Sequence, residues 1–295
     1  MPMIRCHSFA LALATFVAAQ EAPRQDASPT LQGAVVRPVQ IYKNADELLT
    51  ALETADADLK SLTADIKYDK TDGIAGDRQE RRGKLYFEDK GDADETAGKR
   101  DRTFSIRFDE LRQGDRVEKE SKLYIFDGEW FTEINPKFKQ VLKRQVVPPG
   151  EKFDPLRIGE GPLPLPIGQK KADIAQRFFG ELLNESAGLD GMSQADRTKL
   201  LEFVKGAYQL RLVPKPNTEE AGKFSEIRLW YRDLGDGTGL LPRMARTVTP
   251  GDNTVSLIQM INVKTNVPID PNMLDQGVQG PDWNIDIQPW VAPAR

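Results

Sequence analysis

The feature that most constrains this chain is a series of short segments in which apolar and polar residues alternate. In the clearest one, Phe104, Ile106 and Phe108 are separated by polar residues. A period of two is typical of a β-strand with one buried face. Similar segments, separated by turn sequences, cover 64–69, 81–88, 122–126, 129–135, 140–145, 208–213, 224–231, 243–248 and 254–264. The sequence predicts a mainly β fold with one antiparallel sheet of roughly nine to eleven strands.

Three helices are predicted beside these strands. Asn44 can cap a helix over 45–62, whose apolar stripe consists of Leu48, Leu52, Ala55, Leu59 and Leu62. Two more helices are predicted at 172–183 and 194–205, after a proline-rich break that begins at Val147. Because large sheets normally curl, we expect a single, strongly curved antiparallel sheet with these helices in its concave mouth.

The segment 123–126 is unusual because its four residues, LYIF, are all apolar. A strand on the surface of an antiparallel sheet normally has one polar face. We therefore expect both faces of this strand to be covered. One would look into the concave side of the sheet, and the other would pack on an outside element such as the C-terminal tail.

The N-terminus resembles an export signal. Arg5 precedes a short apolar run that ends in small residues at Ala19, which predicts a signal peptide over 1–19. An uncleaved apolar helix on a cytoplasmic protein is the alternative. The predicted cleavage would remove Cys6 and His7, the chain's only cysteine and histidine, and leave an exported protein without thiol or imidazole chemistry. The formal net charge of −4 gives no basic excess to favour nucleic acid.

Several motifs follow one another in a characteristic order: LKSLTADIKY, GKLYFE, FSIRF, LYIFDGEWFTEINP and the late stretch from LPRMARTVTPGDNTV to NVPIDPNML. In this order they resemble the LolA-like periplasmic carriers of outer-membrane lipoproteins. There are three departures. The insert is longer than the usual lid, Asp89 stands where relatives tend to have a basic residue that ties the lid, and the tail 276–295 has no recognised counterpart. The family also includes envelope-stress regulators that sense lipoproteins with the same fold.

The resemblance covers about residues 44–275 and implies an incomplete, half-open β-barrel closed by the N-terminal helix and an inserted helical lid (147–206). Before it, composition predicts a flexible leader (20–43), and after it comes a C-terminal tail (276–295). The resemblance also implies a monomer without catalysis, cofactor or metal, which binds acyl chains of lipoproteins or related lipids. An inner-membrane donor complex and an outer-membrane acceptor would be its partners.

The predicted apolar cavity is lined by residues from several strands: Leu85, Phe87, Phe104, Ile106, Phe108, Leu123, Ile125, Trp130, Leu210, Leu229 and Leu257. The predicted lid residues are Ile174, Phe178, Leu182, Leu201 and Val204. The alternative is that these side chains fill an ordinary core, as they do in most small barrels.

Other hypotheses remain open on the sequence alone. Asp127, Glu129 and Glu133 are close enough in sequence for a carboxylate-based hydrolase, which needs two convergent acids. A basic patch of Lys137, Lys139, Lys143 and Arg144 is either a solvated face or a site for phosphate groups or an acidic partner. The tail with Trp283, Ile285, Ile287 and Trp290 is an added edge strand, a docking segment or disordered.

Overall fold

A computed structural model of the chain describes residues 42–94, 99–150, 158, 167, 170–189, 192–233, 239–275, 277 and 279–291. The expected signal peptide and the Pro-Leu-Pro-Leu-Pro run at 162–166 lie outside the described residues. The first half contains α1 (Ala45–Leu52), β1 (Ser61–Thr71), β2 (Arg78–Asp94), β3 (Lys99–Gln113), β4 (Arg116–Lys119), β5 (Leu123–Phe126), β6 (Trp130–Asn135), η1 (Pro136–Phe138) and β7 (Gln140–Gln145). The second half contains α2 (Lys171–Arg177), β8 (Phe178–Leu183), α3 (Gln194–Val204), β9 (Tyr208–Pro214), α4 (Glu219–Lys223), β10 (Glu226–Asp233), β11 (Leu240–Val248), β12 (Val255–Thr265), η2 (Pro271–Met273) and β13 (Asn284–Gln288).

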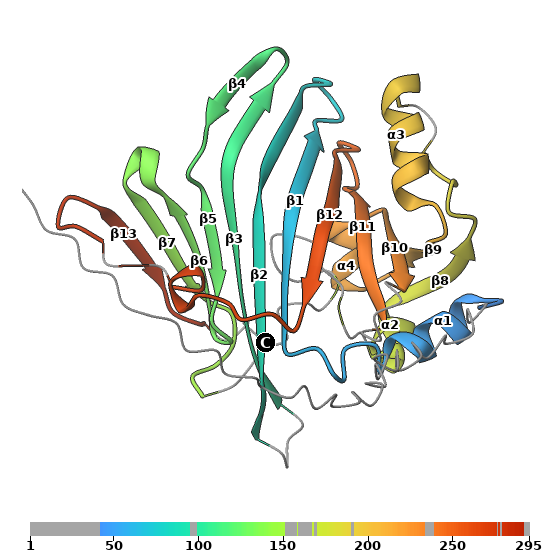
Figure 1. Ribbon diagram of the computed structural model, residues 1–295, viewed down its shortest axis with the longest axis horizontal. Helices are drawn as coiled ribbons and strands as arrows, with labels where there is room; N and C mark the ends of the chain where they lie inside the picture. Colours follow the sequence, from blue (N-terminus) through green and yellow to red (C-terminus); the bar gives the residue numbers. More distant parts are fainter. Residues whose placement is uncertain are drawn as a thin grey trace, which may run out of the picture. The chain divides into compact units, whose positions relative to one another are not determined.

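The strands form one sheet of 13, in the order β13-β7-β6-β5-β3-β2-β1-β12-β11-β10-β9-β8, with β4 paired to β3 off this path. All described pairings are antiparallel except that of β13 with β7, which is parallel. Strand β1 lies in the middle, between β2 and the late strand β12 (Figure 1).

The expected strong curvature was wrong. The sheet is neither closed nor strongly curled, and its edge strands β13 and β8 do not pair with each other (Figure 1). The physical reason lies in how apolar surface is buried. Closure would bury one inner face, but here apolar side chains on both faces are buried in three separate clusters. Helices and the tail cover them from either side, so the sheet does not have to wrap around a single core.

Helix α1 begins as predicted but ends early. The side chain of Asn44 accepts a hydrogen bond from the Glu47 amide at 2.9 Å, and Asp46 and Glu47 occupy the first turn, where acidic residues are favourable. The helix ends at Leu52 rather than at 62, and β1 begins at Ser61. Leu62 continues the alternation of Ala64 and Ile66 in that strand. Leu62, which was assigned to the apolar stripe of the helix, therefore belongs to the alternating pattern of β1.

The predicted helix over 172–183 divides into two elements. Residues 171–177 form α2, and residues 178–183 form β8, which pairs with β9 from Phe178 to Leu183. This segment provides β9 with its second neighbour, a tertiary requirement that local periodicity does not contain. The helix predicted over 194–205 is confirmed as α3, capped by Ser193, whose side chain accepts a hydrogen bond from the Asp196 amide at 3.1 Å.

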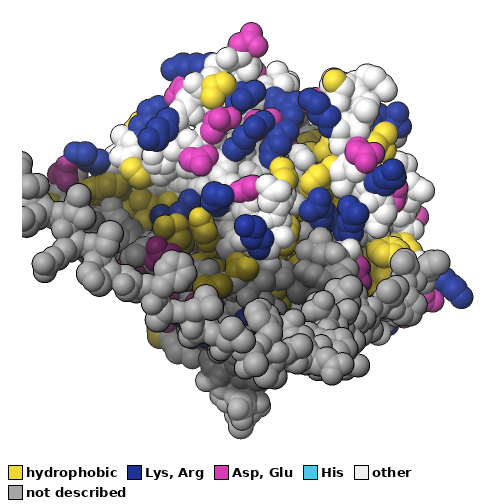
Figure 2. All heavy atoms as spheres, viewed as in Figure 1, with side chains coloured by type: hydrophobic (Ala, Val, Ile, Leu, Met, Phe, Trp, Pro, Cys, Tyr) yellow, Lys and Arg dark blue, Asp and Glu magenta, His cyan; other side chains and the backbone are white. Residues whose placement is uncertain are grey.

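The two faces of the sheet are covered differently, and we name them the α1 face and the α3 face. Leu48, Leu49 and Leu52 of α1 belong to the largest apolar cluster. Leu200 and Val204 of α3 belong to a second cluster with Trp230, on the opposite side of the strands. The surface turned to the viewer in Figure 2 carries many interspersed Lys, Arg, Asp and Glu side chains.

Candidate functional site

The strongest candidate site is the apolar layer on the α1 face. Alternate residues of nine neighbouring strands, from β5 through β1 to β8, contribute buried side chains to it. Phe104 and Phe126 lie opposite each other on β3 and β5, with their rings 5.8 Å apart and stacked. Seven predicted cavity residues belong to this layer: Leu85, Phe87, Phe104, Ile106, Phe108, Leu210 and Leu229. The structure therefore brings most of the predicted set together on one surface.

Four residues of the predicted set lie elsewhere. Leu123 and Ile125 form a separate cluster with Trp283 of the tail, and Leu257 packs beside Val204 of α3. Trp130 is partly buried, with the Lys143 ammonium 5.0 Å from its ring centroid.

The reason for this separation is the pleat, which sends successive side chains to opposite faces. Tyr124 and Phe126 point to the apolar layer, while Leu123 and Ile125 point away from it. The expectation that both faces of 123–126 are covered, one of them by the tail, is confirmed.

The predicted lid is divided between the two faces as well. Ile174 and Phe178 are buried in the apolar layer, and Leu182 packs against it from β8. Leu201 and Val204, by contrast, belong to the cluster of α3 on the other face. The predicted lid residues therefore lie on both faces of the sheet. Ile158 and Ile167, which precede α2, are also buried in the layer.

The two helices over the layer pack on it through Leu48, Leu49, Leu52 and Ile174, and a few polar contacts join them to each other. The Lys171 ammonium lies 2.6 Å from the Asp46 carboxylate and donates to the Thr50 hydroxyl at 3.0 Å. The Lys171 amide donates to Glu53 at 3.0 Å. These contacts join the start of α2 to α1, and they are exposed to solvent, where ion pairs stabilise only weakly.

A buried charge cluster joins the turn after α1 to the sheet. Arg102 of β3 contacts the carboxylate of Asp56, and its Nε donates to Asp89 Oδ2 of β2 at 3.0 Å. All three side chains are buried. Asp89 stands out in the sequence as a departure from the family pattern, but its partner Arg102 does not. Arg102 precedes the alternating segment that begins at Phe104. The alternation therefore does not predict that Arg102 lies in a strand with its side chain buried.

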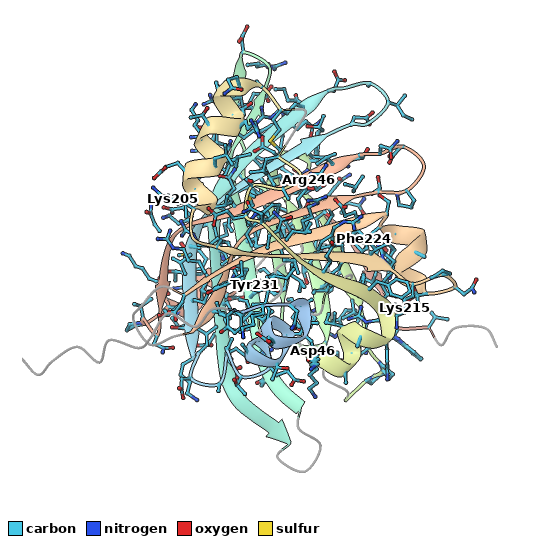
Figure 3. The ribbon with its side chains drawn as sticks, turned by 90° about the vertical axis from the view of Figure 1, so that its right-hand side faces the viewer. Asp46, Lys205, Lys215, Phe224, Tyr231 and Arg246 are labelled. Atoms are coloured by element: carbon cyan, nitrogen blue, oxygen red, sulfur yellow. The ribbon has the colours of Figure 1, made fainter. Side chains whose placement is uncertain are left out.

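One polar atom in the apolar layer is left without a partner. Tyr231 of β10 is 0% exposed, and its hydroxyl has no hydrogen-bond partner among the described residues (Figure 3). Burial raises the pKa of Tyr231, so the hydroxyl keeps its proton and can act as a donor. An unpaired buried hydroxyl costs about 1–3 kcal/mol. A ligand with an acceptor oxygen in this layer would remove that cost.

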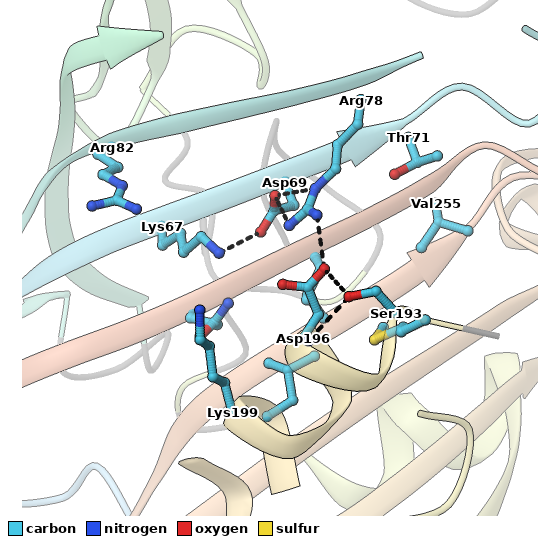
Figure 4. Close-up of a pocket in the computed structure, with 13 residues that line it drawn as sticks. Lys67, Asp69, Thr71, Arg78, Arg82, Ser193, Asp196, Lys199 and Val255 are labelled. Carbon is cyan, nitrogen blue, oxygen red and sulfur yellow. Dashed lines mark hydrogen bonds and ion pairs between the residues drawn. The ribbon is translucent and has the colours of Figure 1, made fainter. Parts of the chain in front are cut away.

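A pocket of about 420 Å³ opens on the α3 face, between α3 and strands β1, β2 and β12 (Figure 4). Arg78 donates to Asp69 at 2.8 Å and to Asp196 at 3.1 Å, and the Lys67 ammonium lies 3.3 Å from Asp69. The Ser193 hydroxyl, together with Arg78, lowers the pKa of Asp196. These charges pair with one another, so an apolar ligand would have to separate ion pairs in order to enter. The pocket is the weaker candidate.

The carboxylates proposed for a hydrolase do not converge. Asp127 accepts the amides of Glu129 and Trp130 in the turn, at 3.1 and 2.7 Å. Glu129 accepts from Gln145 at 2.6 Å, and Glu133 lies 2.6 Å from the Lys122 ammonium. Each acid therefore has a local structural partner.

Among the residues that the structure describes, no three His, Cys, Asp or Glu side chains lie together as a metal site would require. Within the same residues, no helix is long and apolar enough to cross a membrane.

Comparison with known proteins gives similarity in structure alone. No family model and no curated protein matches the chain. Structural neighbours include LolA superfamily, lipoprotein-sorting, MucB and LprF proteins, all at low sequence identity.

Three of these neighbours illustrate the level of similarity. An uncharacterized conserved protein from Thermus thermophilus is 11% identical with a TM-score of 0.42, over 83% of this chain and 99% of the other. A putative outer membrane lipoprotein-sorting protein domain from Vibrio parahaemolyticus is 10% identical with a TM-score of 0.39, over 79% and 96%. A LolA superfamily protein from Nitrosomonas europaea is 8% identical with a TM-score of 0.32, over 80% and 99%.

Proposed function

We propose that this protein is a periplasmic carrier that holds acyl chains of a lipoprotein or a related lipid against its α1 face. The observation that carries the proposal is the width of this buried apolar layer, together with the shortness of the two helices that a bound acyl chain would replace as cover. The layer extends over nine neighbouring strands, which span roughly 40 Å. Helices α1 and α2 have 8 and 7 residues, which corresponds to lengths of only about 12 and 10 Å.

Acyl chains need such a surface in water. Each buried CH₂ group is worth about 0.8 kcal/mol, so a chain of some fifteen carbons costs on the order of 12 kcal/mol to leave exposed. A carrier must also release its cargo, so the cover should be held by contacts that are easily exchanged. The contacts of Lys171 with Asp46, Thr50 and Glu53 are exposed, so α1 and the start of α2 could separate at little cost.

The unpaired hydroxyl of Tyr231 gives the layer a means to recognise more than hydrocarbon. An acylated lipoprotein has ester or amide carbonyl groups where its chains begin. A carbonyl oxygen next to Tyr231 would accept the hydrogen bond that no described residue accepts. Lipids with a carbonyl near the apolar chain would then bind better than plain hydrocarbons of the same length.

The proposed route follows from export and from the cargo. The mature protein would receive its cargo from an inner-membrane donor complex and deliver it to an outer-membrane acceptor. Sheltering the chains on the α1 face would allow this transfer across an aqueous compartment.

A binding titration on the purified mature protein tests the proposal. A fluorescent long-chain fatty acid should bind saturably, and a diacylated peptide should displace it. Phe104→Asp should abolish binding, because Phe104 is 3% exposed within the layer and a buried charge is strongly unfavourable. Val117→Asp is the matched control, since Val117 is 52% exposed on β4.

Circular dichroism and thermal unfolding must show that both variants are folded. If Phe104→Asp unfolds, the milder Phe104→Asn and Leu229→Asn serve in its place. Unchanged binding in folded variants of the layer would overturn the proposal.

A further inference from the structure

The C-terminal tail extends the sheet by a strand of a different kind. Residues Asn284–Gln288 form β13, which runs parallel to β7 in register with 140–144. Parallel neighbours are not produced by hairpins, because the chain must cross over to form them. Here the chain leaves β12 in the middle of the sheet and crosses the α3 face, where Arg107 Nε donates to the Met273 carbonyl at 3.0 Å. The tail reaches the β7 edge as a separate piece.

A small number of contacts hold β13 in place. Trp283 packs against Leu123, Ile125, Ile134 and Val141, so it serves as the apolar anchor. Lys139 contacts the carboxylate of Asp282, and the Lys139 carbonyl accepts from the Asn284 amide at 2.9 Å. At the other end, Arg144 Nε donates to Gln288 Oε1 at 3.2 Å. The β7 edge therefore binds the tail through the apolar slot that holds Trp283 and through the side chains of Lys139 and Arg144.

The strand itself adds little buried surface. All five residues of β13 are exposed, including Ile285 at 48% and Ile287 at 57%. Strands of this kind are held by backbone hydrogen bonds and a few side-chain anchors, which is the mode by which extended peptides add to the edge of a sheet. The backbone groups of β7 would accept any strand with suitable side chains.

We propose that the β7 edge is a strand-addition site for an extended peptide of a partner protein, and that the tail fills it in cis as a built-in competitor. The partner peptide would resemble the tail in chemistry. It would carry an acidic residue and an aromatic anchor, followed by alternating β-branched and polar or acidic residues. The acidic residue would pair with Lys139 and the aromatic residue would fill the slot that holds Trp283. The alternating residues would then pair along β7 from Val141 onwards.

The tail limits access to the site because it is part of the same chain. A segment tethered to its site acts at an effective concentration of the order of mM. A free peptide of similar intrinsic affinity therefore binds poorly until the tail is weakened or displaced. The inference is independent of the acyl carrier proposed above, since β7 and the tail contribute to a different apolar cluster.

The test uses the full chain and a labelled peptide with the sequence of residues 280–291. Trp283→Ala should release the tail, and the variant should then bind the peptide at least ten times more tightly than the wild type in fluorescence anisotropy. Val291→Ala is the matched control, because Val291 is 83% exposed and outside β13. Its binding should equal that of the wild type.

Charge reversal locates the site. In the Trp283→Ala background, Lys139→Glu should weaken the peptide several-fold, and a peptide with Asp282→Lys should restore binding. Circular dichroism shows whether each variant is folded. If the Lys139→Glu variant does not fold, Arg144→Glu with a peptide carrying Gln288→Lys serves as a second pair. Failure of the released variant to bind, or equal binding by the wild type, would overturn the proposal. Self-association of the released variant in place of peptide binding would overturn it too, because a second copy would then be the occupant.

Discussion

Arg177 of α2 donates to the carboxylate of Glu220 in α4 at 2.8 Å, and both side chains are buried. The same guanidinium group donates to the Ile158 carbonyl at 2.7 Å and contacts Asp173. The C-terminal end of α2 is therefore fixed by buried polar contacts, whereas its start is joined to α1 by exposed ones. The two ends of the cover differ in how firmly they are held.

Removing Arg177 should be costly. Arg177→Ala leaves Glu220, which is 5% exposed, as an uncompensated buried charge. The loss of one partner from a buried pair typically costs about 3–5 kcal/mol. Urea denaturation measures the change. Lys223→Ala is the control, because Lys223 pairs only with the exposed Glu219 among the described residues, and it should change stability by less than about 0.5 kcal/mol.

Stability should fall in acid. Burial would raise the pKa of Glu226, but hydrogen bonds from Arg228 and Arg211 outweigh it and lower that pKa; Arg82 and Lys67 do the same for the pKa of Glu80. Such groups contribute stability above the unfolded pKa of about 4.3, and this is lost as the pH falls through the lower folded pKa. The free energy of unfolding should therefore be level near neutral pH and decrease below about pH 4.3. Glu226→Gln should flatten that decrease, and an equally steep profile would contradict the assignment.

Gly83 should tolerate no side chain. It lies at an irregularity in the pairing of β2 with β3, and a Cβ there would meet the Arg107 carbonyl oxygen at 2.0 Å. We expect Gly83→Ala to lose about 2 kcal/mol or more, because the backbone of β3 must shift. Gly222→Ala is the matched control in helix α4, where a Cβ would meet nothing within 4 Å, and it should be neutral or stabilising. Thermal unfolding of the two variants gives the comparison.

Tyr231→Phe should separate polar recognition from apolar binding. The variant removes a hydroxyl that has no described partner, so the free protein should keep or slightly gain stability. Binding of a diacylated peptide should weaken about five- to tenfold, the worth of one hydrogen bond, while a hydrocarbon probe should bind as before. Equal binding of both ligands by the variant would show that the hydroxyl makes no contact with cargo.

Hydrogen exchange should distinguish the cover from the sheet. We expect the amides of α1 to exchange faster than those of β3 in the free protein, because exposed contacts hold α1 to α2. A bound acyl chain should slow them. The amides of α3 serve as an internal control, because α3 packs on the other face and should not respond to the ligand. If the amides of α1 are as protected from exchange as those of β3 and do not respond to ligand, α1 is a fixed part of the scaffold.

The sequence predicted those parts of the fold that depend on local pattern. Residues 140–145 were predicted as a strand and form β7 with the same bounds, and the alternation of Phe104, Ile106 and Phe108 gave one face correctly. Face assignment failed where consecutive residues are apolar. Nothing in LYIF tells which of Leu123 and Tyr124 points to the α1 face, because that depends on pairing with β3.

Tertiary requirements explain the other differences. Residues 178–183 became a strand because β9 provides an edge there. The contact of Arg102 with Asp56 joins residues that are far apart in the sequence, so no local pattern announces it. The orphaned hydroxyl of Tyr231 could not be foreseen either, because an unmade hydrogen bond is visible only when all its neighbours are in place.

The pairing of β1 with β12 has a consequence for how the chain is made. Residues 62–71 pair with 255–265, so one edge of the first strand has no partner until nearly the whole chain has been synthesised. The hairpins of the first half can form early, but within the sheet β1 is joined to the strands of the second half only through this late pairing with β12. Proteins dominated by such distant pairings fold slowly, and an open central edge invites pairing with other chains. Until β12 has been made, the exposed edge of β1 is therefore the part of the chain that most needs protection by a chaperone.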